Sequence, residues 1–165
     1  MCIRDRCWRG RKTELPKEYP DVGLYHPHSD GKILTSIEDL PKLENPAGTI
    51  GILLMRSYVL SGDTAHYDAV IKRFTEENIQ VIPAFSGGLD ARPAIEKYFK
   101  NSEKPVIDGL LSLTGFSLVG GPAYNDSEAA ISLLKEINLP FVSPRIPWNS
   151  KLYHSGLAQV AALVQ

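Results

Sequence analysis

The sequence predicts an α/β fold: a flavodoxin-like or Rossmann-like parallel sheet, wound with crossover helices into three layers. Apolar runs recur at residues 49–55, 79–85 and 106–113, and stretches with helical periodicity separate them. Buried strands that alternate with amphipathic helices are typical of parallel sheets. The first run, TIGILLM, is continuously apolar, which is expected of a strand covered on both faces.

Length and composition agree with a single compact domain. The chain has 165 residues, of which 43% are hydrophobic and 22% charged, and its formal net charge is -1. These values are near the averages for globular proteins and argue against disorder, coiled coils and nucleic-acid binding. The longest apolar run, Ile50 to Met55, is far shorter than the roughly 20 residues that cross a bilayer. We therefore expect a soluble, cytoplasmic protein.

The two ends differ in character from the middle of the chain. Cys2 and Cys7 lie in MCIRDRCWRG, which lacks the apolar core of a secretory signal. We expect residues 1–17 to be a non-native or disordered head and 18–48 an irregular segment with a short strand near 21–27. The α/β domain is then expected at 49–142, followed by a tail at 143–165.

The helix expected after the first strand has a clear apolar face. Asp63 can cap its start, and Asn78 can end it because asparagine tolerates the left-handed conformation. Four residues at positions i, i+3, i+4 and i+7 share one side of this helix: Tyr67, Val70, Ile71 and Phe74.

The later elements follow the same alternation. Pro83 lacks a backbone donor, which predicts that the second strand lies at a sheet edge or that Pro83 is near the strand's end. A helix of about two turns is expected on Ile95, Tyr98 and Phe99. Asn125 and Glu128 resemble a capping box. The helix that they start carries Ala130, Ile131, Leu134 and Ile137, and a short fourth strand is expected at 139–142.

Three loops rich in glycine, serine or threonine follow the expected strands: RSYVLSGDTAHY, SGGLD and TGFSLVGGPAYND. Ligands of open α/β sheets bind outside the carboxyl ends of the strands, where these loops are expected to meet. Glycine allows a backbone to approach a ligand or a partner loop closely. Turn chemistry explains the same glycines equally well, so both interpretations stay open.

The most polar of these loops is the first, which holds Arg56, Ser57, Asp63, His66 and Tyr67. Arg56 could clamp a carboxylate, for example a propionate of a tetrapyrrole. The alternative is that Arg56 pairs with Asp63 or Asp90 and ties two loops together. For His66 the alternative to a site role is a hydrogen-bonded surface histidine.

Other motifs predict no catalytic residue or metal ligand. The two histidines of HPH, residues 26–28, lack the further ligands that zinc or copper requires. The GFSLV segment fails the nucleophile-elbow pattern at its last position. No GxxxxGK[ST] or GxGxxG motif occurs, so we do not expect this chain to hydrolyse ATP.

Three stretches carry a resemblance to a known family: GTIGILLMRSYVLSGDTAHYDAVI, VIPAFSGGLDARPAIE and SLTGFSLVGGPAYND. They resemble the large, porphyrin-binding H subunits of magnesium chelatase in the CobN/magnesium chelatase family, and the first is closer to the bacteriochlorophyll version. EYPDVGLYHP extends the resemblance to residues 18–142. The large subunit of cobaltochelatase is the related alternative. Because proteins of this family are much larger, the chain resembles a fragment of one.

The resemblance implies a function for the whole large subunit. A protein of this kind binds protoporphyrin IX while the AAA+ subunits I and D hydrolyse ATP and Mg²⁺ is inserted, in (bacterio)chlorophyll biosynthesis. The cavity residues of the family lie beyond the end of this chain, so the fragment is expected to bind no cofactor and to be inactive alone. The resemblance implies that this chain contributes an edge for substrate or domain contact. The residues expected at that edge are Arg56, Ser57, Gly62, Asp63, His66, Gly87, Gly88, Thr114, Gly115, Gly120 and Gly121.

Residues 143–165 depart from the family pattern, and a frameshift is one explanation of the departure. Two interpretations from other classes stay open. The chain could be a stand-alone flavodoxin-like module that binds a small anion, or a structural domain that docks the partner subunits.

Overall fold

A computed structural model of the chain describes residues 18–29, 32–102, 104–121 and 124–144. The expectations for the head at 1–17 and for the tail beyond Pro144 lie outside these residues. No helix in the described ranges is long and apolar enough to cross a membrane.

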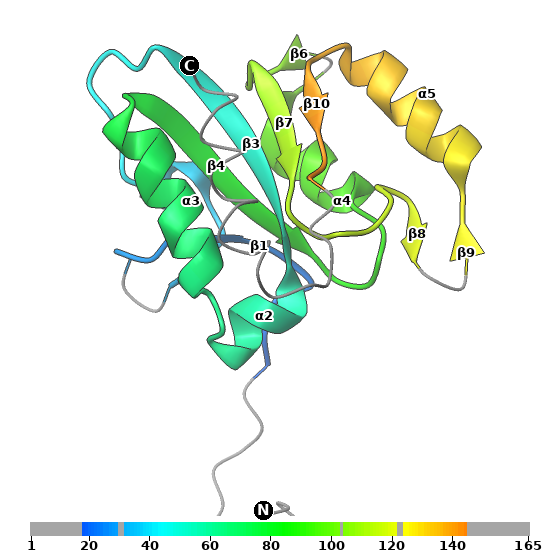
Figure 1. Ribbon diagram of the computed structural model, residues 1–165, viewed down its shortest axis with the longest axis horizontal. Helices are drawn as coiled ribbons and strands as arrows, with labels where there is room; N and C mark the ends of the chain where they lie inside the picture. The colour runs from blue at the N-terminus through cyan, green and yellow to red at the C-terminus, as the bar shows by residue number, and fades with distance from the viewer. Residues whose placement is uncertain (1–17, 30–31, 103, 122–123, 145–165) are drawn as a thin grey trace, which may run out of the picture.

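A six-stranded sheet in the order β10-β7-β3-β4-β1-β2 forms the centre of the molecule (Figure 1). Strands β10, β7, β3 and β4 are mutually parallel, whereas β1 is antiparallel to β4, and β2 to β1. The sheet is therefore mixed, which corrects the prediction of a parallel sheet. Its strands are β1 (Val22–Tyr25), β2 (Ile33–Leu34), β3 (Gly48–Met55), β4 (Ile79–Ser86), β7 (Gly109–Ser112) and β10 (Phe141–Val142).

Helices connect the parallel strands, and short hairpins and a 3-10 turn complete the described fold. The helices are α2 (Arg56–Ser61), α3 (Ala65–Glu76), α4 (Arg92–Ala94), which continues as the π-helix η2 (Ile95–Phe99), and α5 (Ser127–Ile137). The minor elements are the turn η1 (Ile37–Asp39) and the pairs β5 (Lys100–Asn101) with β6 (Lys104–Pro105) and β8 (Gly120–Gly121) with β9 (Tyr124–Asn125).

Two apolar clusters on opposite faces of the sheet make the three layers. On one face, α3 packs the four side chains of its predicted stripe against Ile52 and Leu54 of β3. On the other face, η2 and α5 pack against Leu53 and Ile82. Alternate residues of β3 therefore enter opposite clusters, as expected of a strand covered on both sides. The prediction of a three-layer α/β fold is confirmed (Figure 1).

The second strand is not an edge strand, although it contains Pro83. Strand β4 lies between β3 and β1. Its ladder with β1 joins Val22, Gly23 and Leu24 to Ser86, Phe85 and Ala84, so it stops one residue short of Pro83. A missing backbone donor is tolerated next to the end of a ladder.

Both predicted helix caps are wrong. Thr64, not Asp63, is the N-cap of α3, and Asp126, not Asn125, caps α5 by accepting a hydrogen bond from the Ala129 amide at 2.9 Å. Both differences amount to one residue, because neighbouring polar residues compete for the same position. The predicted end of α3 is confirmed, since Asn78 has a φ of 58°.

Other boundaries and burial also differ from the predictions. The segment after β3 starts directly with α2 rather than with a loop. The third strand covers Gly109–Ser112 only, and Val106 is exposed. On α5, Leu133 and Ile137 are buried while Ile131 is 51% exposed. Ala130 and Leu134 pack against the same cluster, so three of the four residues expected on the apolar side face the core and Ile131 does not.

Candidate functional site

The carboxyl ends of the three central strands lie side by side. In the register of the sheet, Met55 at the end of β3 pairs with Ser86 at the end of β4, and Leu53 pairs with Ser112 at the end of β7. This confirms the prediction that the three following segments meet along one edge. We call this the carboxyl edge, and it lies toward the bottom of Figure 1.

The segments after β4 and β7 are joined by backbone hydrogen bonds. The Ala91 amide donates to the Leu118 carbonyl at 2.8 Å, and the Gly120 amide donates to the Leu89 carbonyl at 3.0 Å. Asp90 and Val119 form an isolated antiparallel bridge between these two bonds. Two loops that are far apart in sequence therefore form one wall.

A depression opens at this edge between the ends of β3, β4 and β7. It is shallow, with a volume of about 20 Å3, enough for about one water molecule. Leu53, Leu54 and Met55 form one side, and the other sides include Leu89 and Phe116. Leu89 is 40% exposed and Phe116 is 37% exposed. We call this feature, with these lining residues, the apolar depression.

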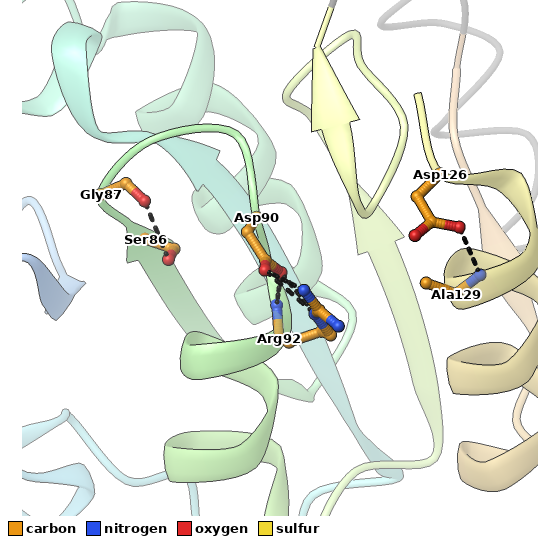
Figure 2. A network of polar contacts seen from close by, with 6 residues as sticks. All are labelled: Ser86, Gly87, Asp90, Arg92, Asp126 and Ala129. Carbon is orange, nitrogen blue, oxygen red and sulfur yellow. Dashed lines mark hydrogen bonds and ion pairs between the residues drawn. The ribbon is translucent and has the colours of Figure 1, made fainter. Parts of the chain in front are cut away.

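Polar side chains around the apolar depression bond within their own loops. The carboxylate of Asp90 accepts hydrogen bonds from the Arg92 guanidinium, one of them at 2.6 Å, and from the Arg92 amide at 2.9 Å (Figure 2). These bonds lower the pKa of Asp90. The hydroxyls of Ser112 and Thr114 lie 3.0 Å apart, and the Ser86 hydroxyl donates to the Gly87 carbonyl at 3.4 Å.

The Arg56 side chain hydrogen-bonds to the segment that precedes β1. Its Nε donates to the Pro20 carbonyl at 3.0 Å and its Nη2 to the Tyr19 carbonyl at 3.1 Å. An ion pair with Asp21 at 3.8 Å adds little, because the Asp21 side chain is 89% exposed. The expected pairing of Arg56 with Asp63 or Asp90 is wrong. Arg56 fixes the entry of the chain into the sheet.

The other candidates after β3 form an aromatic cluster rather than a polar pocket. The His66 ring lies at a tilt of 48° against the Tyr67 ring, with centroids 3.9 Å apart, and makes an edge contact with Tyr58 at 5.4 Å. Burial lowers the pKa of His66. The Tyr67 hydroxyl accepts a hydrogen bond from the Met55 amide at 3.1 Å, and Ser57 and Asp63 are exposed.

Glycine occupies the positions at the carboxyl edge for different structural reasons. Gly88 has a φ of 73°, and a Cβ there would meet no atom within 4 Å, so turn geometry explains it. At Gly87 a Cβ would lie 3.2 Å from the Asp21 carbonyl oxygen, so close approach of the backbone explains this residue. Three more predicted glycines also have positive φ: Gly62, Gly115 and Gly120. Gly121 pairs with Tyr124 in the β8–β9 hairpin.

A second polar cluster beside α3 was not predicted. The buried Tyr25 hydroxyl lies 2.9 Å from the Thr64 hydroxyl and 2.6 Å from the Asp68 carboxylate. Burial and the bond with Asp68 raise the pKa of Tyr25 to about 12. Asp68 lies one turn after Thr64 on α3, but its partner Tyr25 is 43 residues away, so no local pattern could have linked the two.

The HPH segment, residues 26–28, directly follows Tyr25 of this cluster in the chain. His26 is 6% exposed, and its Nδ1 accepts a hydrogen bond from the His28 amide at 3.3 Å. Burial and the neighbouring His28 lower the pKa of His26. Within the described ranges, no three His, Cys, Asp or Glu side chains lie where they could hold a metal ion.

The structure brings two of the predicted site residues, Gly88 and Thr114, into the lining of the apolar depression. Arg56, Asp63 and His66 do not line it. Sequence reasoning missed Leu89 and Phe116. Both are bulky apolar residues that directly follow a glycine, and this is the signal that could have found them.

Together these features define a three-layer α/β domain whose carboxyl edge combines an apolar depression with internally paired polar groups. A family model described as CobN/Magnesium Chelatase matches residues 1–155. The chain therefore belongs to the CobN/magnesium chelatase family.

Curated relatives agree with this assignment. The chain is 55% identical over 139 residues to the magnesium-chelatase H subunit of Rhodobacter capsulatus, a match that covers 84% of this chain and 11% of the relative. It is 36% identical over 144 residues to the chloroplastic magnesium-chelatase protein ChlH of Oryza sativa, covering 79% of this chain and 10% of the relative. The chain thus spans about a tenth of the length of these relatives.

One partial structural likeness is to the catalytic subunit of cobaltochelatase from Mycobacterium tuberculosis. It has a TM-score of 0.43 and 16% sequence identity and covers 61% of this chain and 7% of that chain.

Proposed function

We propose that this chain is a scaffold piece of the large, porphyrin-binding subunit of a magnesium chelatase that works in the cytoplasm. The observation that carries the proposal is the 55% identity, over 84% of the chain, to the Rhodobacter capsulatus relative. In the whole enzyme this large subunit would bind protoporphyrin IX while AAA+ subunits I and D hydrolyse ATP and Mg²⁺ enters the macrocycle as a substrate. The product would serve (bacterio)chlorophyll biosynthesis.

Within that enzyme, the proposed role of this piece is to position other parts of the large subunit. Arg56 supports this role, because its guanidinium is used by two backbone carbonyls of its own chain. The candidate edge residues Ser57, Gly62, Asp63, His66, Gly87, Gly88, Thr114, Gly115, Gly120 and Gly121 then shape a contact edge and take no part in catalysis. On this proposal the isolated chain neither inserts magnesium nor binds a cofactor.

We classify the parallel part of the sheet as flavodoxin-like. Numbered along the chain, the four parallel strands lie in the order 2-1-3-4, which matches that class. The antiparallel pair β1 and β2 extends the sheet beyond it.

A replacement experiment tests the proposed function. Residues 18–144 of this chain would replace the matched stretch of the Rhodobacter capsulatus relative. The chimera should bind protoporphyrin IX, measured by its absorption shift, and should support magnesium insertion with the partner subunits and ATP. A chimera with the same stretch deleted is the control.

Three outcomes contradict the proposal. A folded chimera that cannot bind porphyrin, although the unmodified relative binds it, argues against the assignment. Binding of FMN or inorganic phosphate by the isolated chain, measured by calorimetry, would favour an independent small-anion module. A chimera that works with Co²⁺ and cobaltochelatase partners, but not with Mg²⁺, would favour the cobaltochelatase assignment.

A further inference from the structure

We propose that a bulky apolar side chain from another part of the same large subunit covers the shallow apolar depression at the carboxyl edge. This inference rests on the proposed function, because it requires that the chain works inside a longer polypeptide. It assigns the edge to contact within the protein rather than to a porphyrin, a phosphate or a flavin.

The first argument is the chemistry of the lining. Leu89 and Phe116 offer apolar surface, being 40% and 37% exposed, and Met55 beside them is partly exposed. An exposed pair of this size at an open depression favours an apolar occupant, because covering it removes apolar surface from water.

The second argument is that three of the four polar residues in the lining, Ser86, Asp90 and Thr114, already have side-chain hydrogen bonds. Asp90 is neutralised by Arg92, and the Thr114 hydroxyl bonds to its neighbours Ser112 and Phe116. Arg56, the arginine closest in sequence to the end of β3, bonds to Tyr19 and Pro20. An anion at the depression would find no unpaired arginine among these described groups, whereas an apolar side chain requires none.

The third argument is length. The curated relatives are about nine times longer than the matched stretch, which is 11% of the Rhodobacter capsulatus protein. A stable contact between separate proteins buries about 800 Å2 on each partner, and two half-exposed side chains do not supply that area. A tethered segment needs less area, because the linkage gives it an effective concentration in the millimolar range. This favours the same polypeptide over a second copy.

Hydrogen exchange can test the contact in the chimera described above. Amides of residues 88–91 and 114–117 should exchange at least about tenfold more slowly in the chimera than in the isolated chain. The amides of Lys104 and Val106 lie at the opposite end of the strands and should exchange at equal rates in both. A matched pair of variants sharpens the test: Leu89→Asp with Phe116→Asp, against Val106→Asp with Ile131→Asp.

The edge variant should lose the protection in the chimera, and the control variant should keep it. In the isolated chain both variants should keep their melting temperatures within about 3 °C, because all four side chains are partly exposed. A melting temperature that falls further for the edge variant alone would assign these residues to folding and would overturn the docking role.

Three further results would overturn the inference. The first is equal exchange in chimera and isolated chain. The second is protection that appears only after porphyrin is added, which would make the edge a substrate surface. The third is protection of the isolated chain that rises with its concentration, which would indicate a second copy. A chimera that binds porphyrin but leaves the edge unprotected refutes the docking role alone, whereas a protected chimera without porphyrin binding refutes only the proposed function.

Discussion

At the amino end of the central strands, polar side chains tie distant segments together. The Asp108 carboxylate accepts a hydrogen bond from the Thr49 amide at 2.7 Å, and the Asp108 amide donates to the Thr49 carbonyl at 2.7 Å. The Gln80 side chain likewise accepts from the Leu43 amide at 2.9 Å and donates to the Pro41 carbonyl at 3.0 Å. These bonds close the end of the sheet with the chain's own backbone.

At the apolar depression the polar side chains bond to residues only one or two positions away. Asp90 bonds with Arg92, and Thr114 with Ser112 and Phe116. Such local bonds shape each loop but leave Leu89 and Phe116 facing water. One end of the sheet is thus closed by bonds between distant segments of this chain, whereas the other leaves apolar side chains exposed. Arg56 lies between these two patterns. It follows β3 at the carboxyl edge, yet it bonds to the Tyr19 carbonyl of a distant segment, as the side chains at the amino end do.

The largest effect is expected from a substitution in β3, the strand that runs between the two ends of the sheet. In β3, a Cβ on Gly51 would lie 2.8 Å from Ile107 Cδ1 and 3.1 Å from the Phe99 ring. Gly51→Val should lower the free energy of unfolding by about 3 kcal/mol, because the site is buried and overpacked. Urea unfolding measures this change. An unchanged unfolding midpoint would contradict the packing described for this face.

A smaller effect is expected at the boundary between the two ends. Arg56→Gln should cost about 2 kcal/mol of stability, because two carbonyls lose charge-assisted donors. Arg56→Lys should recover part of the loss, since one ammonium cannot reproduce the forked geometry. In the chimera, Arg56→Gln should leave porphyrin affinity unchanged. A loss of affinity without a loss of stability would instead indicate a ligand clamp.

Removing the Asp108 hydrogen bond at the amino end should cost more stability than removing the Asp90 bond at the depression. Asp108→Ala removes a bond between separate segments and should cost about 1 kcal/mol. Asp90→Ala removes a bond within one loop and should cost about half as much. Equal losses, measured by urea unfolding, would remove the distinction between the two ends.

The smallest expected effect is a pH dependence of stability. Burial holds the pKa of folded His26 below the unfolded value of 6.5. The unfolded state therefore binds more protons, and the contribution of neutral His26 is fully present above pH 6.5 and declines as the pH falls through that value. His26→Asn should flatten the curve of melting temperature between pH 8 and pH 5 relative to the unmodified chain, and His28→Asn should flatten it less, because His28 only adds to the effect of burial on the pKa of His26. A curve that keeps its slope in His26→Asn would contradict this origin.

The sequence predicted the features that depend on neighbouring residues. The apolar run of β3, the buried stripe of α3 and the left-handed Asn78 follow from periodicity and from the preference of one residue type. The burial of Ile95, Tyr98 and Phe99 on one helical face follows in the same way.

Features that depend on long-range pairing were not predicted. The antiparallel β1 lies next to β4 because Val22 to Leu24 pair with residues some 60 positions later, and this pairing also places Pro83 in an interior strand. The partners of Arg56 and Tyr25 are 36 to 43 residues away. The apolar depression exists only once three strand ends are aligned, so the sequence marks Leu89 and Phe116 as apolar residues after glycines but does not show that they share one surface.

Cysteine labelling tests the central claim most directly. Phe116→Cys and, as the control, Val106→Cys would be placed in a background with Cys2→Ser and Cys7→Ser. Their rates of maleimide labelling would be measured by mass spectrometry in the isolated chain and in the chimera. We predict that the cysteine at position 116 reacts at least about tenfold more slowly in the chimera, while the cysteine at 106 reacts equally in both. Equal rates for position 116 in the two proteins would contradict the account.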